Sequence, residues 1–248
     1  MAFLQKMNLR KIILPVALAL PVVAWGAGPK VKVDGYLNLS SAYIWRGEQV
    51  CNVHVNPGVA VTFAGLRLEN YNYLSLDGGY KEIDWDLSYT LGDFSLHVAD
   101  YYSCSPASGA AEDFFSWKKG ATGHVDELAL VYSSSVIPLD IKWFTFFWGS
   151  WLPEPDGRPG NNSFSSFLEL GTHVQTGERG TASATLGVSV FKGMYTQYKE
   201  SFMPVHAALA YTYVIPLGGS LSVPLQATVV VNPYTRACYA GASAGLAF

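Results

Sequence analysis

Charged side chains recur at every second residue in several stretches of this chain. Glu82, Asp84 and Asp86 form one such series, and Arg67 and Glu69 form another. A period of two places these groups on one face of a β-strand. The same phase adds further charged residues to that face, and the full set is Arg46, Arg67, Glu69, Glu82, Asp84, Asp86, Glu127, Lys142 and Glu169.

Six carboxylates against three bases would favour cations if this face lines a water-filled interior, because rings of acidic side chains select cations in pores. A second interpretation stays open beside it. The nine groups then pair across neighbouring strands and hold a narrow barrel together, with no passage.

Nucleophilic chemistry has weaker support. Of the five histidines, His54 and His124 fall near the same strand ends as Ser165, but no Gly-x-Ser-x-Gly elbow accompanies them. The cysteines and histidines lack metal-ligand spacing, and no glycine-rich phosphate loop is present. We therefore expect no catalytic residue, no metal and no cofactor, and we do not expect an enzyme.

The chain has three cysteines, Cys51, Cys104 and Cys238. Cys51 follows the first predicted strand and Cys238 begins the last, and closure of a barrel makes these two strands neighbours. The two Cα atoms could then come within the roughly 4.4–6.8 Å that a disulfide requires. A Cys51–Cys238 disulfide and three unlinked thiols remain alternatives of similar weight.

Alternating apolar residues predict twelve strands. The last two are the clearest, because every second residue from Leu221 to Val231 and from Ala240 to Phe248 is apolar. The predicted strands cover residues 31–45, 54–63, 66–74, 82–89, 94–102, 125–132, 139–148, 163–174, 181–191, 205–214, 221–231 and 240–248. In the third strand, Asn70 and Asn72 fall on the apolar face, so a bulge is expected there.

The predicted connections alternate between short glycine-rich turns and longer segments, of which residues 103–123 are the longest. Aromatic residues collect near both ends of the strands, with Tyr43 and Trp45 expected to face outward at one end. The final strand stops on Phe248. These features are typical of an all-β, antiparallel transmembrane barrel with short periplasmic turns and longer extracellular loops. Ten or fourteen strands are the alternatives.

Composition agrees with this fold class. Apolar residues make up 50% of the chain and charged residues only 14%, against about 25% charged in ordinary soluble domains. Residues 1–26 carry Lys6, Arg10 and Lys11 before an apolar run, which indicates a signal peptide, leaving residues 27–248 for the barrel. Without that segment 13 basic residues face 19 acidic ones, which argues against a nucleic-acid partner.

One motif resembles a known family. Tyr43-Ile44-Trp45-Arg46-Gly47 resembles the Tyr-x-Trp-Arg-Gly motif of the TorF or Gcw_chp-like outer-membrane proteins. Lys81-Glu82-Ile83-Asp84, before a Gly-Asp turn, and Asn232-Pro233, before the final strand, are similar to sequences of that Bacteroidota-type family. The resemblance covers mainly the first hundred residues and the C-terminus. It implies a β-barrel and transport, with no substrate, and the cysteines and the long segment 103–123 depart from it.

The leading functional hypothesis is a passive, porin-like channel for small solutes in the outer membrane of a Gram-negative bacterium. Its expected partners are outer-membrane lipid, a small solute, and the barrel-assembly machinery, which would read the strand ending at Phe248. A non-conducting barrel that presents its loops is the second hypothesis, and a lipid-active enzyme is the third.

Overall fold

The computed structural model describes residues 30–104, 113–117, 122–149 and 164–248. The expected signal peptide and most of the segment 103–123 lie outside these residues. Within the described part, no helix is long or apolar enough to cross a membrane. The described residues from Val31 onward form one compact unit.

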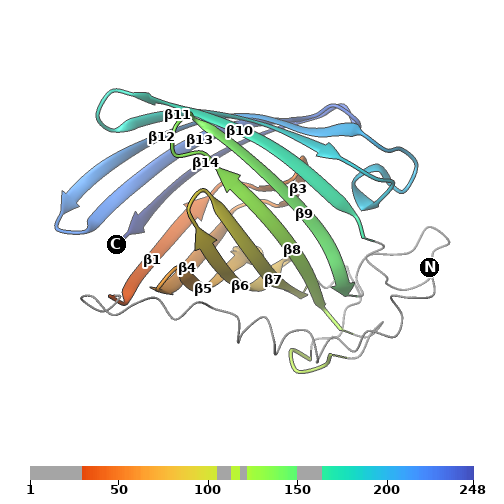
Figure 1. Cartoon of the computed structure of the whole chain (residues 1–248), viewed down its shortest axis with the longest axis horizontal. Coiled ribbons are helices and arrows are strands. Elements are labelled where there is room, and N and C mark those ends of the chain that lie inside the picture. Colours follow the sequence, from red (N-terminus) through yellow and green to blue (C-terminus); the bar gives the residue numbers. More distant parts are fainter. Residues whose placement is uncertain (1–29, 105–112, 118–121, 150–163) are drawn as a thin grey trace. The chain divides into compact units, whose positions relative to one another are not determined.

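That unit is a closed antiparallel barrel of twelve strands (Figure 1). This confirms the predicted fold class. The strands of the barrel are β1 (Lys32–Ser40), β4 (His54–Phe63), β5 (Leu66–Ser75), β6 (Lys81–Leu91), β7 (Phe94–Cys104), β8 (His124–Ser133), β9 (Leu139–Gly149), β10 (Ser166–Thr176), β11 (Gly180–Ser189), β12 (Met203–Gly218), β13 (Leu221–Asn232) and β14 (Ala237–Ala247).

Each strand pairs with its neighbour in the chain, and β1 closes the ring against β14. The pairing of β1 with β14 extends to Phe248, which exchanges two backbone hydrogen bonds of 3.1 and 2.9 Å with Gly35. We call the end of the barrel that holds the β4–β5, β6–β7, β8–β9, β10–β11 and β12–β13 connections the turn end, and the opposite end the loop end. Two loop-end connections, 76–80 and 233–236, are as short as turn-end connections, so the predicted alternation of lengths is only partial.

The outer face of the barrel is apolar. Leu37 and Leu39 of β1 are each 51% exposed, and every strand contributes a similar residue. Large exposed apolar side chains of this face include Leu37, Leu39, Val59, Val61, Leu68, Trp85, Leu87, Leu96, Val98, Leu128, Leu130, Ile141, Leu170, Leu186, Leu209, Val229 and Leu246. Water-soluble monomers rarely expose apolar patches of more than a few hundred Å², and a band that surrounds the whole barrel exceeds this.

The bulge expected near Asn70 and Asn72 is absent, because the register of β5 against β4 and β6 is constant. Both amides remain on the outer face and are satisfied there. Asn70 Nδ2 donates to the carbonyl of Asp84 at 2.9 Å, and Asn72 Nδ2 donates to Asn70 Oδ1 at 2.9 Å. Hydrogen bonding thus removes most of the cost of two amides on an apolar face.

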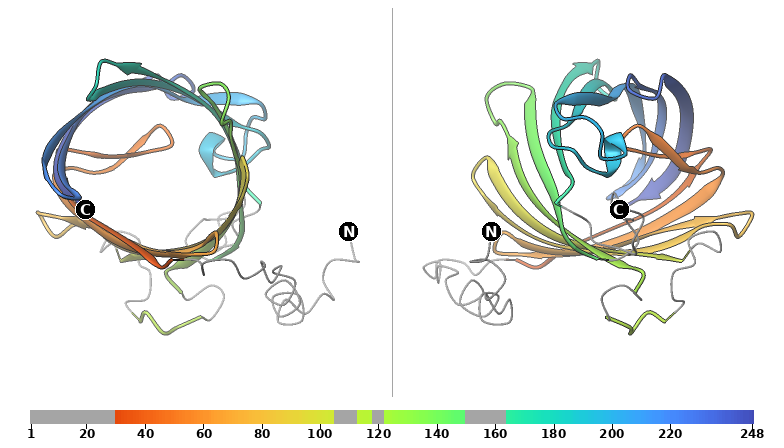
Figure 2. Two further views of the ribbon diagram at one scale, coloured as in Figure 1. Left: turned by 60° about the vertical axis from the view of Figure 1, so that its left-hand side comes forward. Right: turned by 90° about the vertical axis from the view of Figure 1, so that its right-hand side faces the viewer.

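The first strand is shorter than predicted. It ends at Ser40, and the chain then forms a separate hairpin of β2 (Tyr43–Trp45) and β3 (Glu48–Cys51). Viewed along the barrel, this hairpin projects into the ring (Figure 2). The outward orientation predicted for Tyr43 and Trp45 is therefore wrong. We call the enclosed space the lumen and residues 43–51 the lumen hairpin.

The chain reverses its direction in the two-residue turn of the lumen hairpin, at Arg46 and Gly47. Arg46 and Gly47 have φ values of +46° and +88°, the left-handed pair that a tight two-residue hairpin turn requires. Gly47 is also packed closely, because a Cβ atom there would collide with the backbone carbonyl of Val205. A glycine is needed at this position both for its φ and for its size.

We expect Gly47→Ala to undock the lumen hairpin. The positive φ costs an alanine about 1–2 kcal/mol, and the collision with Val205 adds to this. Trypsin digestion of the folded barrel in detergent measures undocking as cleavage after Arg46, which is buried in the native protein.

Gly78→Ala is the matched control, because Gly78 has a φ of +73° and nothing within 4 Å of an added Cβ. It carries the same backbone cost without the collision. Equal protection of Arg46 in both variants would contradict the proposed tight docking.

Candidate functional site in the lumen

Arg46, at the tip of the lumen hairpin, forms a buried ion pair with Glu127 of β8. Arg46 Nη1 donates to Glu127 Oε1 at 2.5 Å, and Nη2 donates to Oε2 at 2.7 Å. The two side chains are 8% and 1% exposed. Because β8 belongs to a different part of the ring from β1, this bidentate contact fastens the hairpin across the lumen.

Two tyrosine hydroxyls complete the polar contacts of the pair. Tyr101 donates to Glu127 Oε2 at 2.8 Å, and Arg46 Nη1 donates to the hydroxyl oxygen of Tyr195 at 2.5 Å. Tyr195 lies in η2 (Met194–Thr196) of the β11–β12 connection. Such a network is what a buried pair needs, since desolvation otherwise outweighs the attraction between the charges.

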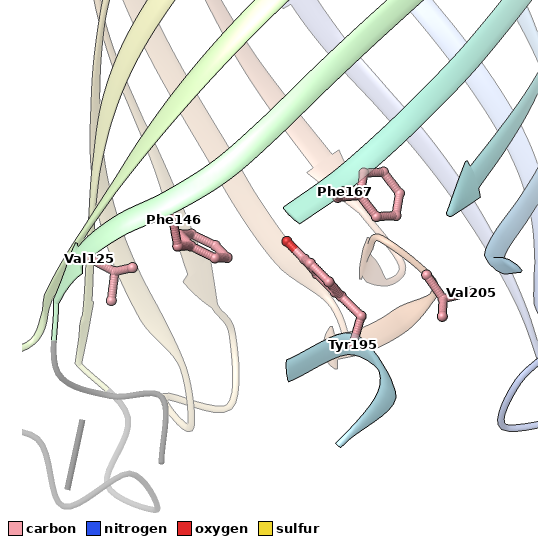
Figure 3. Close-up of a cluster of buried hydrophobic side chains, with 5 residues drawn as sticks. All are labelled: Val125, Phe146, Phe167, Tyr195 and Val205. Carbon is pink, nitrogen blue, oxygen red and sulfur yellow. The ribbon is translucent and has the colours of Figure 1, made fainter. Parts of the chain in front are cut away.

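Aromatic rings surround the guanidinium. Arg46 Cζ lies 4.2 Å from the ring centroid of Phe144, 4.8 Å from that of Trp45 and 5.1 Å from that of Phe167. Figure 3 shows Tyr195 between Phe146 and Phe167 in the buried cluster of the barrel. Cation–π attraction within about 6 Å of a ring centroid adds to the stability of the buried charge.

The charge state of Arg46 follows from these contacts. Burial alone lowers the pKa of the guanidinium, but the Glu127 carboxylate raises it well above its ordinary value. Arg46 therefore stays protonated, and the pair persists as an ion pair.

Most of the other charged residues that were predicted for the inner face also contact an acidic or a basic side chain. Arg67 Nη1 donates to Asp34 at 3.1 Å and Nη2 donates to Glu69 at 3.1 Å. Lys142 and Glu169, which are directly opposite in the β9–β10 ladder, are 2.9 Å apart. Asp86 lies 3.1 Å from Nδ1 of His97. Lys142 with Glu169 and Asp86 with His97 join neighbouring strands, as the second interpretation of the sequence requires. Arg67 instead contacts Glu69 of its own strand β5 and Asp34 of β1, beyond the intervening β4.

Glu82 and Asp84 are different, because neither contacts a base among the described residues. Glu82 instead accepts hydrogen bonds from three hydroxyls, those of Tyr43 at 3.1 Å, Ser103 at 2.9 Å and Tyr80. Asp84 is fully buried two residues along the same face of β6. The acidity predicted from the sequence is therefore concentrated at this part of the wall.

Among the described residues the lumen includes three cavities, and the lumen hairpin lines the first two. The first, of about 490 Å³, lies at the loop end, since its walls include Tyr80, Gln197 and Thr235 of loop-end connections. The second, of about 380 Å³, has a polar lining from β1, β4 and β11–β14, and the third, of about 280 Å³, lies beside Asp86 and Lys142. Tyr43 lines the first and second cavities, and Tyr101 lines the first and third.

Sequence reasoning missed the tyrosines that organise this site. Tyr43 stacks on Tyr73 with ring centroids 3.8 Å apart, and Tyr195 lies in a connection that was predicted only as a loop. Asn232 was also missed: its Nδ2 donates to the carbonyl of Gly47 at 3.2 Å. The available signal was the Arg46-Gly47 dipeptide, which could have marked a turn instead of the end of a strand.

Of the two alternatives for the cysteines, the Cys51–Cys238 disulfide is not formed, because both residues are free thiols. Cys238 alternates in phase with Ala240 and Leu246 and is exposed on the outer face of β14. Cys51 pairs with Tyr43 inside the lumen hairpin. Because the chain leaves the barrel wall at Ser41–Ala42 and enters the lumen, Cys51 lies on the opposite side of the wall from Cys238.

The residues considered for nucleophilic chemistry have other partners. His124 Nδ1 lies 2.9 Å from Asp100, and its ring stacks on Trp117. The hydroxyl oxygen of Ser165 accepts a hydrogen bond from the backbone N–H of Met194 at 2.9 Å. His54 Nδ1 contacts the carbonyl of Asn52 at 3.0 Å.

Comparison with known proteins gives weak structural likenesses. No protein-family model and no curated protein matches the chain. The porin KdgM in complex with disordered oligogalacturonate is similar, with 9% identity, a TM-score of 0.48 and coverage of 88% of this chain and 98% of that one. The monoaromatic hydrocarbon channel CymD has 9% identity, a TM-score of 0.42 and coverage of 89% and 88%. The outer membrane phospholipase A from Escherichia coli has 9% identity, a TM-score of 0.39 and coverage of 92% and 91%. These values identify no family and assign no activity.

We expect Arg46→Ala or Glu127→Ala to destabilise the folded barrel by about 3–5 kcal/mol, because each leaves a buried charge without its partner. The double variant Arg46→Ala/Glu127→Ala should lose less than the sum of the two. Urea-induced unfolding in detergent micelles measures the free energies. Arg67→Ala is the control, since its pair is one-third exposed and should cost about 1 kcal/mol or less; equal losses for Arg46 and Arg67 would contradict this.

We expect the thiol of Cys51 to react slowly at neutral pH. Burial, with the nearby Asp77 carboxylate, raises its pKa to about 11, so the thiol is protonated below that pH and the reactive thiolate is scarce. In a Cys104→Ser/Cys238→Ser background, the rate of alkylation should rise about tenfold per pH unit between pH 8 and 10. A rate that levels off near pH 8.5 would show an unperturbed thiol.

Proposed function

We propose that the protein is a passive channel for small solutes in the outer membrane of a Gram-negative bacterium. The observation that carries the proposal is the division of the closed barrel into an apolar outer band and an interior with charged side chains and three cavities. An apolar band around every strand is energetically suited to lipid, and charges in the membrane zone are tolerated where they face one another or water.

The lumen hairpin is the constriction of this channel. A barrel of twelve strands has room for side chains and for a narrow passage. Tyr43 and Tyr101 stand between the loop-end cavity and the two cavities beyond it. A solute must pass these residues, so the channel admits small solutes and conducts weakly. Glu82, a carboxylate in the wall of the loop-end cavity that contacts no base among the described residues, gives it a preference for cations.

The motif that resembles the TorF or Gcw_chp-like family supports kinship with those barrels. Its Arg46-Gly47 dipeptide forms the tip of the lumen hairpin. The proposed assembly partner is the machinery that inserts barrels into the outer membrane. It would recognise β14, whose outward face carries Leu246 and is followed by Phe248.

Planar-bilayer recording tests the channel. Wild-type protein should give small, cation-selective current steps, with a reversal potential of the sign for cations in a salt gradient. A variant with residues 43–51 replaced by a short glycine-serine linker, together with Glu127→Gln, should give larger steps. Heat-denatured protein is the control, and folded preparations of both proteins that give no steps would defeat the proposal.

A further inference from the structure

Glu82 is a buried carboxylate in the wall of the loop-end cavity. Glu82 is 5% exposed and lines this cavity. Its carboxylate accepts hydrogen bonds from three hydroxyl groups, those of Tyr43, Tyr80 and Ser103. Three donors suit an ionised carboxylate, and no base contacts Glu82 among the described residues.

Aromatic side chains form much of the same cavity. Tyr43, Trp45, Tyr80, Tyr195 and Tyr234 all line it, and a second carboxylate, Glu48, lies in the same lining. The volume of about 490 Å³ falls within the roughly 300–1,000 Å³ of small-molecule pockets. Aromatic rings around a carboxylate are the combination that binds organic ammonium ions.

The barrel already contains one filled site of this composition. Glu127 binds the guanidinium of Arg46, and the rings of Trp45 and Phe144 flank that cation. Trp45 and Tyr195 contribute to both places, because they also line the loop-end cavity. The second carboxylate–aromatic arrangement, around Glu82, lacks a cation from the described chain.

We propose that the loop-end cavity binds a small organic cation of the ammonium type, with Glu82 as the counter-charge and the aromatic walls around the alkyl groups. The proposal rests on the channel function, because this cavity is where a solute from the loop end would first stop. Binding also bears on passage, since Glu82 accepts the hydrogen bond of Tyr43, which stands between this cavity and the next.

Isothermal titration calorimetry on the folded protein in detergent micelles tests the site. The probes are choline and its uncharged isostere, in which carbon replaces the quaternary nitrogen. Wild-type protein should bind choline about tenfold or more tightly than the isostere, because the isostere has no charge for the Glu82 carboxylate and the aromatic rings to attract. Glu82→Gln should weaken choline binding by about tenfold or more and leave the isostere unaffected.

Glu178→Gln is the control for net charge, since Glu178 is exposed in the β10–β11 turn; it should bind choline like wild type. No choline binding, equal binding of choline and the isostere, or equal affinities of the two variants would overturn the proposal. If Glu82→Gln does not fold, the comparison of choline with the isostere on wild type decides. Choline binding without bilayer current would refute the channel alone, and current without choline binding would refute the site alone.

Discussion

The bidentate contact between Arg46 and Glu127 governs the interior of this barrel. Both groups are removed from water, so the pair is stable only while its geometry and its tyrosine partners are kept. This requirement fixes the tip of the lumen hairpin, and with it the left-handed turn at Arg46 and Gly47. One ion pair therefore determines where a whole segment of the chain lies across the barrel.

The remaining charges of the inner face have two kinds of environment. Along β9 and β10 they pair across adjacent strands, as Lys142 does with Glu169, and near the turn end Arg67 pairs with Glu69 of its own strand. Such part-exposed pairs contribute little stability each but cancel the field that each charge would set up alone. At Glu82 and Asp84 of β6 this pairing stops, and Glu82 accepts hydrogen bonds from hydroxyl groups instead. The pairing that the second interpretation requires is thus present along part of this wall and absent around Glu82 among the described residues.

Period-two alternation was enough to predict twelve strands and their outer faces, because a slip by one residue would turn every side chain over. It failed at residues 41–51, where Tyr43 and Trp45 continue the alternation of β1 although the chain has left the sheet. The pattern cannot separate a spanning strand from a short hairpin that follows in phase. The phase held no evidence against the disulfide, because Cys51 and Cys238 lie on opposite sides of the wall only through the inward course of residues 43–51.

The number of strands sets the diameter of a barrel wall, but the free space inside this barrel also depends on the lumen hairpin, which belongs to no spanning strand. Tyr43 stacks on Tyr73 of the wall and donates to Glu82, so its position responds both to the docking of the hairpin and to whatever neutralises Glu82. Two contacts of one side chain thereby link the environment of Glu82 to the position of the lumen hairpin beside the first two cavities. Because both contacts involve groups on the inner face, the apolar outer wall has no part in that link and can remain rigid in lipid.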